Sequence, residues 1–314
     1  MKPLVHALCA ALLAVAGAAI AADNLKILVP ANPGGGWDQT GRALAQAMQS
    51  AGLVKSVRIE NRGGAGGTIG IAQFVNSSKG DPDALMVAGL VMVGAIELNK
   101  SPVTLAQVTP IARLTAEYEV IVVPSGSKIQ SFRDLVAAFK ANPGAVSWGG
   151  GSAGGVDHIL VGMIAKEIGT DAAKINYVPY AGGGEAVAAI LGGHVTAGVS
   201  GLGEFAEQIK SGKMRALAQS SPKKLEGIAS LKEQKINVEL GNWRGIFGAP
   251  GLTAQQRDGL VKLVKSATET PAWKQTLEKL GWEGWYLGGE DYAKFLREDE
   301  KRVGAIIESL GLKK

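Results

Sequence analysis

The 314-residue sequence predicts an α/β fold made of one large or two medium domains. Short runs of β-branched and apolar residues alternate with amphipathic stretches of helical period, and glycine-rich turns repeatedly join the two. Strands separated by helices of this length form parallel βαβ crossovers, so we expect buried, nearly continuous apolar strands. The composition, 46% hydrophobic and 19% charged, is that of an ordinary globular protein.

Residues 1–21, MKPLVHALCAALLAVAGAAIA, have the pattern of a secretory signal peptide. The positively charged Lys2 precedes an apolar stretch at 4–20, and the segment ends in a small-x-small sequence. We therefore predict cleavage between Ala21 and Ala22 and a mature protein in the periplasm or outside the cell. The alternative is an uncleaved anchor, but an apolar stretch so short and so rich in Ala and Gly is marginal for spanning a bilayer.

The only cysteine, Cys9, lies inside this segment and comes too early to be a lipoprotein site. The mature chain is therefore predicted to lack disulfides, thiolate metal ligands and thiol nucleophiles. The formal net charge is +5, or +4 once Lys2 is removed, and the basic residues are spread along the chain. This pattern does not predict nucleic-acid binding, and it suits a small anionic ligand at most.

The first set of elements follows the predicted cleavage site. The strand LKILVP, residues 25–30, leads into a glycine loop and a helix from about Asp38 to Gln49 whose apolar residues share one face. A second strand at 56–62 leads into another glycine loop and a helix that runs through Phe74. The run ALMVAGLVM, residues 84–92, is predicted to be a third strand.

A second set of elements begins with the apolar run YEVIVVPSGS, residues 118–127. The strands and helices expected after it lie within 131–144, 145–155, 156–168, 174–193, 195–201 and 213–220. Alternating apolar and polar residues around 113–123 and 237–247 predict two strands that cross between two lobes.

The C-terminal third is predicted to be helical at 253–269, 271–282 and 290–311. Thr253 is predicted to cap the first of these helices, Pro271 fits the first turn of the second, and Glu290 or Asp291 is predicted to cap the third. We expect these helices to pack back on the first lobe.

Four loops share one design, in which glycines lie between a strand and a helix. They are PGGGWD at 33–38, RGGAGGT at 62–68, GGGSAGG at 149–155 and YAGGGE at 180–185. Glycine lets the backbone approach a ligand closely, and a helix that begins there offers free N–H groups and a favourable dipole to an anion. Four such loops at strand ends predict a carboxylate or phosphate site, with Asp38 as the N-cap of the first helix.

The sequence matches few of the known motifs of nucleotide-binding and catalytic sites. A Walker loop is not present, since Gly212-Lys213-Met214 fails its pattern. The pattern G-x-G-x-x-G is met by Gly149, Gly151 and Gly154, and Asp171 falls near the distance of a ribose-binding acid, so a nucleotide-dependent enzyme stays an alternative. No motif for a catalytic triad or a metal occurs, and we predict no catalytic residue, no metal and no cofactor.

Two histidines remain in the mature chain. His158 follows the third glycine loop by one helical turn, where its ring could donate to a bound anion or could cap or decorate the helix surface. His194, in LGGHVTAG, is predicted to be a turn residue.

Five segments in order resemble one known family. The segments VPANPGGGWDQTGRAL, IENRGGAGGTIG, WGGGSAGGVDHIL, VPYAGGGEAVAAILGGHV and NWRGIFGAPGLTAQQ are similar to those of the periplasmic receptors of tripartite tricarboxylate transporters, also called Bug proteins. The resemblance covers essentially the whole mature chain. The variants PGGGWDQTGR and NWRG look most similar to the tricarboxylate, or citrate, branch.

The resemblance implies a two-lobed periplasmic-binding-protein (Venus flytrap) fold, each lobe a mostly parallel sheet flanked by helices. Lobe 1 would comprise residues 22–118 and 243–314, and lobe 2 residues 119–242. The ligand carboxylate would be held in the first lobe by Asn32, Pro33, Gly34, Gly35, Gly36, Trp37, Asp38, Gly66, Gly67 and Thr68. In the second lobe it would be held by Ser152, Ala153, Gly154, His158, Tyr180, Ala181 and Gly182.

The implied function is that of a receptor, not an enzyme. It would capture citrate or another di- or tricarboxylate by closure of its hinge and deliver it to one large and one small membrane subunit, without nucleic acid and as a monomer. Where the family commonly has an Arg-Gly pair, this chain reads Tyr180-Ala181-Gly182, and Arg244 is a possible compensating charge, although plain solvent exposure of this arginine is the favoured interpretation. Receptors for other organic acids, or for a signalling system, stay open as alternatives.

Overall fold

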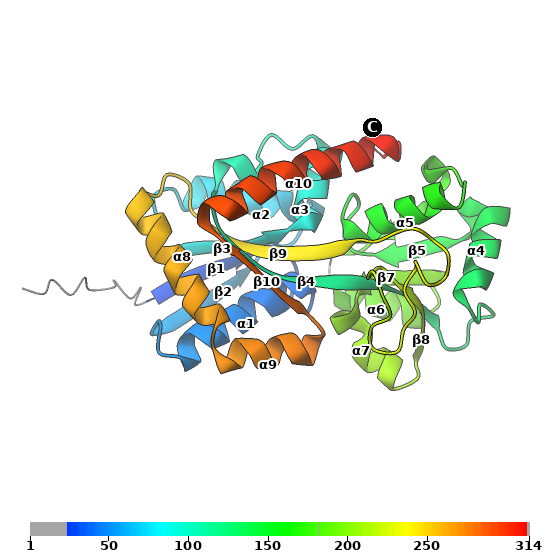
Figure 1. Ribbon diagram of the computed structural model, residues 1–314. Helices are drawn as coiled ribbons and strands as arrows, with labels where there is room; N and C mark the ends of the chain where they lie inside the picture. The colour runs from blue at the N-terminus through cyan, green and yellow to red at the C-terminus, as the bar shows by residue number, and fades with distance from the viewer. Residues whose placement is uncertain (1–23, 182, 313–314) are drawn as a thin grey trace, which may run out of the picture.

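One long strand, β4 (Thr109–Pro124), connects the two halves of the molecule in a computed structural model that describes residues 24–181 and 183–312. Its N-terminal part pairs antiparallel with β9 (Gly241–Gly248) and β10 (Glu283–Gly288). Its C-terminal part pairs antiparallel with β7 (Ala197–Gly201) and β8 (Met214–Gln219). The described strands thus form one continuous sheet in the order β2-β1-β3-β9-β4-β7-β5-β6, with β8 and β10 attached to β4 (Figure 1).

The first half of the sheet has a parallel core. β1 (Asn24–Val29) lies between β2 (Ser56–Asn61) and β3 (Ala84–Gly89) and is parallel to both. The helices of this half are α1 (Gly36–Ser50), α2 (Thr68–Ser77), α3 (Leu90–Asn99), α8 (Ala254–Thr268), α9 (Pro271–Leu280) and α10 (Gly289–Ser309). The first three follow their strands directly, as βαβ connections require.

The second half repeats this arrangement. β5 (Ser147–Gly150) is parallel to both β6 (Asn176–Pro179) and β7. The helices of this half are α4 (Phe132–Ala141), α5 (Val156–Glu167), α6 (Gly183–Leu191) and α7 (Leu202–Lys210). The α/β fold class predicted from the sequence is confirmed, and the crossings predicted near 113–123 and 237–247 are β4 and β9.

Three elements differ from the prediction. The run at 84–92 is a strand only as far as Gly89, because Leu90 begins α3. This helix is apolar and buried on several faces, so the sequence carries no helical period to separate it from the strand. The short elements α7 and β10 were also not predicted; α7 does carry an amphipathic pattern, with Leu202 and Phe205 buried, whereas the six residues of β10 are too few for a clear period.

The predicted helix starts are correct in two of three cases. Thr253 forms a capping box with Gln256 at the start of α8, and Pro271 occupies the first turn of α9 behind the cap of Thr270. The third is wrong, because α10 begins after Gly288 and has no side-chain cap, which leaves Glu290 and Asp291 inside its first turn. Acidic residues are favourable there through the helix dipole alone.

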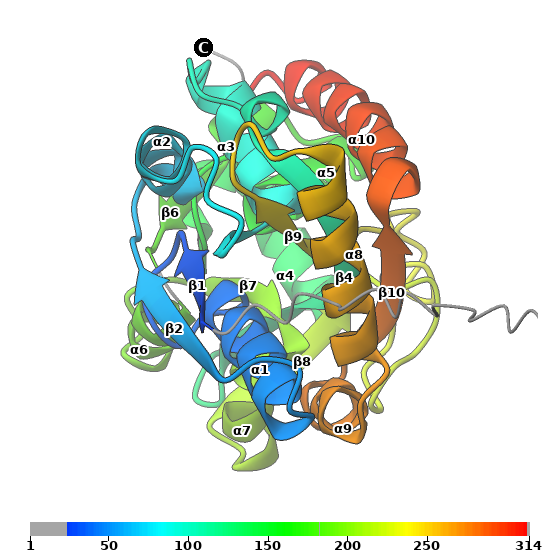
Figure 2. The same cartoon turned by 90° about the vertical axis from the view of Figure 1, so that its left-hand side faces the viewer.

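The C-terminal helices pack on the first half, as expected. α8 and α10 lie over β4 and β10, and α9 lies against α1 (Figure 2). Trp243 of β9 is fully buried and donates its indole N–H to Asp299 of α10 at 2.7 Å. The far end of α10 reaches the second half, where Leu310 packs on Gly162 of α5.

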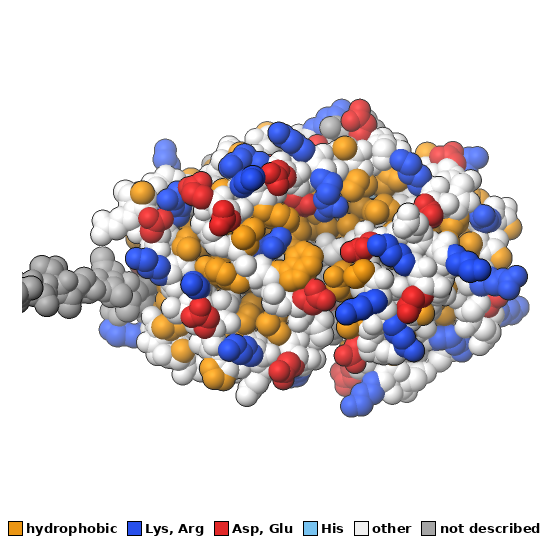
Figure 3. All heavy atoms as spheres, viewed as in Figure 1, with side chains coloured by type: hydrophobic (Ala, Val, Ile, Leu, Met, Phe, Trp, Pro, Cys, Tyr) orange, Lys and Arg blue, Asp and Glu red, His pale blue; other side chains and the backbone are white. Residues whose placement is uncertain are grey.

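The surface seen in Figure 3 carries basic and acidic side chains that are interspersed, and it is indented where the two halves meet. No helix in the described part of the chain is long and apolar enough to cross a membrane.

We predict that Trp243→Phe destabilises the protein by about 1–3 kcal/mol more than Trp148→Phe does, because the buried Oδ2 atom of Asp299 loses its donor. Trp148 is the matched control, since it is equally buried and its indole N–H has no hydrogen-bond partner in the described structure. Urea unfolding of both variants measures the difference. Equal losses of unfolding free energy would show that the indole hydrogen bond does not fix α10.

Candidate functional site

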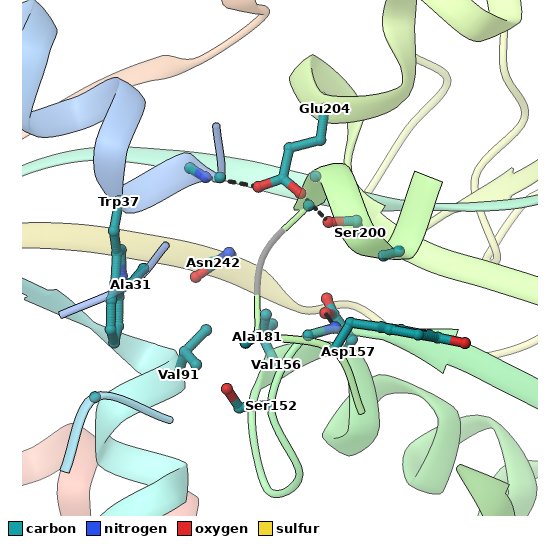
Figure 4. A pocket seen from close by; sticks show the side chains of 18 of the residues that line it. Ala31, Trp37, Val91, Ser152, Val156, Asp157, Ala181, Ser200, Glu204 and Asn242 are labelled. Carbon is teal, nitrogen blue, oxygen red and sulfur yellow. Dashed lines mark hydrogen bonds between the residues drawn. The ribbon is translucent and has the colours of Figure 1, made fainter. Parts of the chain in front are cut away.

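A cleft lies between the two halves, at the carboxyl ends of the parallel strands. The cleft has a volume of about 110 Å³ and opens to further space in the solvent. Figure 4 shows Trp37 and Val91 on one wall, Ser152, Asp157 and Ala181 on the other, and Asn242 of β9 between them. Both walls come from loops that follow strands, as expected for a binding site in an α/β sheet.

The first wall begins at the N-terminus of α1. Gly35 is the N-cap residue and brings no side chain, so the first amides of the helix rely on other partners. Asp38 is not the N-cap that we predicted: it lies in the first turn, and its carboxylate reaches back to accept from the amide of Gly34 and from the side chains of Arg42 and Asn61. Burial raises the pKa of Asp38, but these hydrogen bonds together hold it below its usual value.

The second loop of this wall, Gly64 to Gly67, has positive φ angles throughout. Gly66 and Gly67 need this freedom, because a Cβ at Gly66 would lie 2.3 Å from that of Ala95 and one at Gly67 would lie 2.8 Å from the ring of Trp37. The ring of Trp37 therefore packs close to Gly67 at the start of α2 and forms an apolar wall of the cleft.

The opposite wall is the loop between β5 and α5. Asp157, in the first turn of α5, accepts from the amide of Gly151 at 2.6 Å. His158 accepts at Nδ1 from the amide of Gly154, and its ring stacks on Tyr177 with 4.3 Å between centroids. Burial lowers the pKa of His158 to about 4, so the ring is neutral at physiological pH and acts as a cap for the loop.

A pair of buried carboxyl groups lies beneath this wall. Burial raises the pKa of Glu119 on β4 well above its usual value, and the nearby Asp157 and Glu204 raise it further. Each carboxyl shifts the pKa of the other: Asp157 raises the pKa of Glu119, whereas Glu119 lowers that of Asp157, so Glu119 is the one that keeps its proton. Burial also raises the pKa of Asp157 to about 6. At neutral pH this pair therefore carries about one negative charge.

Arg244 is the one basic side chain among the described residues that line the cleft. We favoured solvent exposure for it, and that interpretation is wrong: Arg244 is 2% exposed, forms an ion pair with Glu117 and lies over the ring of Trp282 at 4.9 Å. Trp282 donates its indole N–H to the same carboxylate at 2.7 Å. Nη1 of Arg244 has no hydrogen-bond partner in the described structure.

Glu204 of α7 reaches across the cleft from the second half. Its Oε1 accepts from the amide of Gly36 at 2.6 Å, and its Oε2 accepts from Oγ of Ser200, also at 2.6 Å. The pKa of Glu204 is raised to about 7, mainly by burial and also by the nearby Asp157, while the two hydrogen bonds act to lower it. A second contact between the halves joins Asn32 to Glu185 at 3.3 Å.

The structure places the residues implied by the resemblance in two groups. Those on the cleft lining are Gly35, Gly36, Trp37, Gly67, Ser152, Tyr180 and Ala181. Those that lie behind or beside the lining are Asn32, Pro33, Gly34, Asp38, Gly66, Thr68, Ala153, Gly154 and His158. Gly182 lies outside the described residues.

Sequence reasoning missed the charged residues of the lining. These are Glu117, Glu119, Asp157 and Glu204. Glu117 and Glu119 carried a usable signal, because two glutamates in the apolar run TAEYEVIVV are unusual in a buried strand. Asp157 and Glu204 resemble ordinary first-turn acids and gave no signal.

No group of three or more His, Cys, Asp or Glu side chains within residues 24–181 and 183–312 is arranged to hold a metal ion.

Comparisons with known proteins agree on one family. The family model described as the tripartite tricarboxylate transporter family receptor (TctC) matches residues 41–312. The UPF0065 protein in gbd 5'region of Cupriavidus necator is 29% identical over 298 residues, which cover 92% of this chain and 88% of that protein. Protein BugT of Bordetella pertussis is 33% identical over 201 residues, which cover 63% of this chain and 60% of BugT.

Solved structures show the same fold at low identity. The periplasmic binding protein BugD has a TM-score of 0.84 at 24% identity, with 93% of this chain and 98% of BugD covered. MatC from Rhodopseudomonas palustris, solved with malate, has a TM-score of 0.79 at 19% identity, with 90% and 98% covered. An R. palustris protein solved with adipate has a TM-score of 0.82 at 20% identity, with 92% and 97% covered.

We predict that the free energy of unfolding falls by about 0.5–1 kcal/mol between pH 6.5 and 8.5. In this range the unfolded chain has already ionised its carboxyls, whereas folded Glu204 loses its proton near pH 7, so stability present at lower pH is lost as pH rises. Below pH 6.5 the neutral His158 opposes this trend, because only the unfolded state takes up its proton. Urea unfolding across the range should show a smaller slope in Glu204→Gln and an unchanged slope in the exposed control Glu207→Gln. A flat wild-type profile would contradict the assignment.

Proposed function

This chain belongs to the tripartite tricarboxylate transporter receptor family and is a solute-binding receptor rather than an enzyme; we propose that it captures a small dicarboxylate in the periplasm by closing two lobes over it. Export would depend on residues 1–21, which we propose to be a cleaved signal peptide. The captured acid would pass to one large and one small membrane subunit of a transporter. The same architecture would also serve a receptor that feeds a signalling system.

The observation that carries the proposal is the meeting of two loop-built walls over one cleft. We propose that residues 22–118 with 243–314 form lobe 1 and residues 119–242 form lobe 2. β4 and β9 would then be the hinge, because β4 pairs with both halves of the sheet and the chain returns from the second half through β9. A ligand that contacts both walls binds the closed state more tightly than the open one, so binding drives closure.

Two groups in the cleft offer hydrogen bonds to a carboxylate. Ala65 lines the cleft, its backbone amide donates no hydrogen bond within the described structure, and it lies just before the N-terminus of α2. Arg244 lines the cleft and has its Nη1 atom unpartnered. Two such donor sets support a ligand with two carboxylates, in agreement with the malate and adipate seen in two proteins of this fold.

The charge of the lining favours a dicarboxylate over citrate. Four carboxyl side chains and one guanidinium surround the space, and the guanidinium is already paired with Glu117. A trianion would have to enter beside carboxyls that no lysine or arginine in the lining balances, and repulsion between like charges at low local dielectric is costly. Citrate therefore stays a candidate, but not the preferred one.

The nucleotide-binding alternative receives no support from the loop that suggested it. The amide of Gly151 is bonded to Asp157 and that of Gly154 to His158. Gly154 also packs against α3, where a Cβ at Gly94 would lie 2.0 Å from its carbonyl oxygen. The amides that a pyrophosphate would need are occupied, so the loop serves the contact between the halves.

We predict that dicarboxylates such as malate, succinate or adipate raise the melting temperature of the mature protein more than citrate does. A ligand at 100 times its dissociation constant stabilises the folded state by about 2.7 kcal/mol. Thermal unfolding with each acid, and with neutral glycerol as a control, measures the effect. No shift with any organic acid would contradict the receptor proposal, and a larger shift with citrate would contradict the charge argument.

We predict that Gly35→Val weakens binding of the best acid from this screen at least tenfold while the fold is kept. Its backbone angles are ordinary, and a Cβ there meets only Gly183 at 3.6 Å and Glu204 at 3.8 Å, so the added methyls occupy the cleft. The matched control is Gly126→Val, which has open space around its Cβ in a loop of the second half. Calorimetric titration compares the two variants, and equal affinities would exclude Gly35 from the site.

A further inference from the structure

Glu204 occupies a position at the N-terminus of α1 that is suited to a ligand carboxylate. The cap residue Gly35 supplies no side chain to the first amides of α1, and the carboxylate of Glu204 bonds the amide of Gly36 instead. This contact is between opposite halves of the molecule, since Gly36 follows β1 and Glu204 follows β7. A carboxylate at a helix N-terminus is favoured by the helix dipole and by free amides.

The neighbouring glycines leave room for this contact. A Cβ at Gly183 would lie 2.3 Å from Oε2 of Glu204, and a Cβ at Gly36 would lie 2.1 Å from Nη2 of Arg244. Larger residues at either position would push these charged side chains away. Some of the glycines in the loops at 33–38 and 180–185 are therefore needed to make room for side chains of this protein, and not only for a ligand.

The charges around Glu204 weaken its contact with Gly36, so that an anion in the cleft can replace it. Asp157 of α5 and Glu119 of β4 lie close enough to repel it, and Glu185 lies at the start of α6 beside the same loop. Arg244 of β9 is near but is paired with Glu117 of β4. Glu204 is thus held by two hydrogen bonds and by no ion pair among the described residues.

We propose that Glu204 is a specificity-determining residue that competes with the ligand carboxylate for the N-terminus of α1. This inference rests on the proposed receptor function and names the residue that sets its affinity for anions. Closed molecules that hold no ligand are stabilised by the bond from Glu204 to Gly36. A carboxylate ligand takes over the amide, and Glu204 turns back toward Ser200 on its own half.

The competition gives the receptor a pH dependence of defined sign. Protonated Glu204 is a weaker acceptor and does not repel the ligand, whereas ionised Glu204 is a stronger competitor and a repulsive charge. Because the pKa of Glu204 is raised to about 7, affinity for an anion falls as pH rises from 6 to 8. Asp157 and Glu119 titrate in the same cleft and add to this dependence, so removal of Glu204 reduces it without abolishing it.

The test uses the mature protein with Glu204→Gln, Glu204→Ala and the control Glu207→Gln, which changes the same charge on the exposed face of α7. Malate is the probe, titrated calorimetrically at pH 6, 7 and 8. At pH 8 we expect both Glu204 variants to bind malate about tenfold more tightly than wild type, which corresponds to about 1.4 kcal/mol. Their affinities should also change less between pH 6 and pH 8, and Glu207→Gln should match wild type. Weaker or unchanged binding in the Glu204 variants would overturn the proposal.

A second measurement separates this inference from the receptor function itself. Small-angle X-ray scattering without any ligand should give a larger radius of gyration for Glu204→Ala than for wild type and Glu207→Gln, because the contact between the halves is lost. An unchanged radius would overturn the competitor role whether or not malate binds. If neither wild type nor variants bind malate or other acids, the receptor proposal fails, and the scattering result still decides whether Glu204 holds the halves together.

Discussion

The buried ion pair between Arg244 and Glu117 lies at the junction of the two halves of this molecule, and the cleft is built around it. It joins β9 to β4, the strand that pairs with both halves of the sheet, and it lies between Gly36 at the N-terminus of α1 and Gly201 at the end of β7. Removing either partner would leave a buried charge uncompensated, which is costly, so the neighbouring backbone has to accommodate the pair. Gly36 and Gly201 do so, since a Cβ at either would lie 2.1 Å from Arg244 or Glu117.

The ion pair also determines the charge of the cleft. Because Glu117 uses the one arginine of the lining, the carboxyls of Glu119, Asp157 and Glu204 have no cationic partner among the described residues. Burial raises the pKa of each of them, and repulsion from neighbouring carboxyls raises those of Glu119 and Glu204 further, so part of their charge is removed by protons. The result is a receptor cleft that recognises anions through backbone amides and one guanidinium while its own acids limit how much negative charge it accepts.

The glycine loops show how far local sequence reasoning extends. Glycine between a strand and a helix predicts close backbone approach, and the loops at 33–38, 62–68, 149–155 and 180–185 do line or border the cleft. The sequence of a loop did not predict which group packs against its glycines. At Gly36 it is a side chain from β9, at Gly94 and Gly154 it is the opposite half of the molecule, and at Gly67 it is the ring of Trp37. These partners lie far away in the chain.

The sequence by itself determined the α/β class, the family and most strands and helices, because period, caps and glycine positions are properties of neighbouring residues. It did not distinguish α3 from a strand, because a helix that is buried on several faces has no amphipathic period. Only the tertiary structure decided the chemistry of the cleft. The charged side chains of the cleft come from β4, β9, α5 and α7, and they become buried and paired only when these four elements pack together. No local sequence pattern shows that these elements meet. The side chains concerned are Glu117, Glu119, Asp157, Glu204 and Arg244.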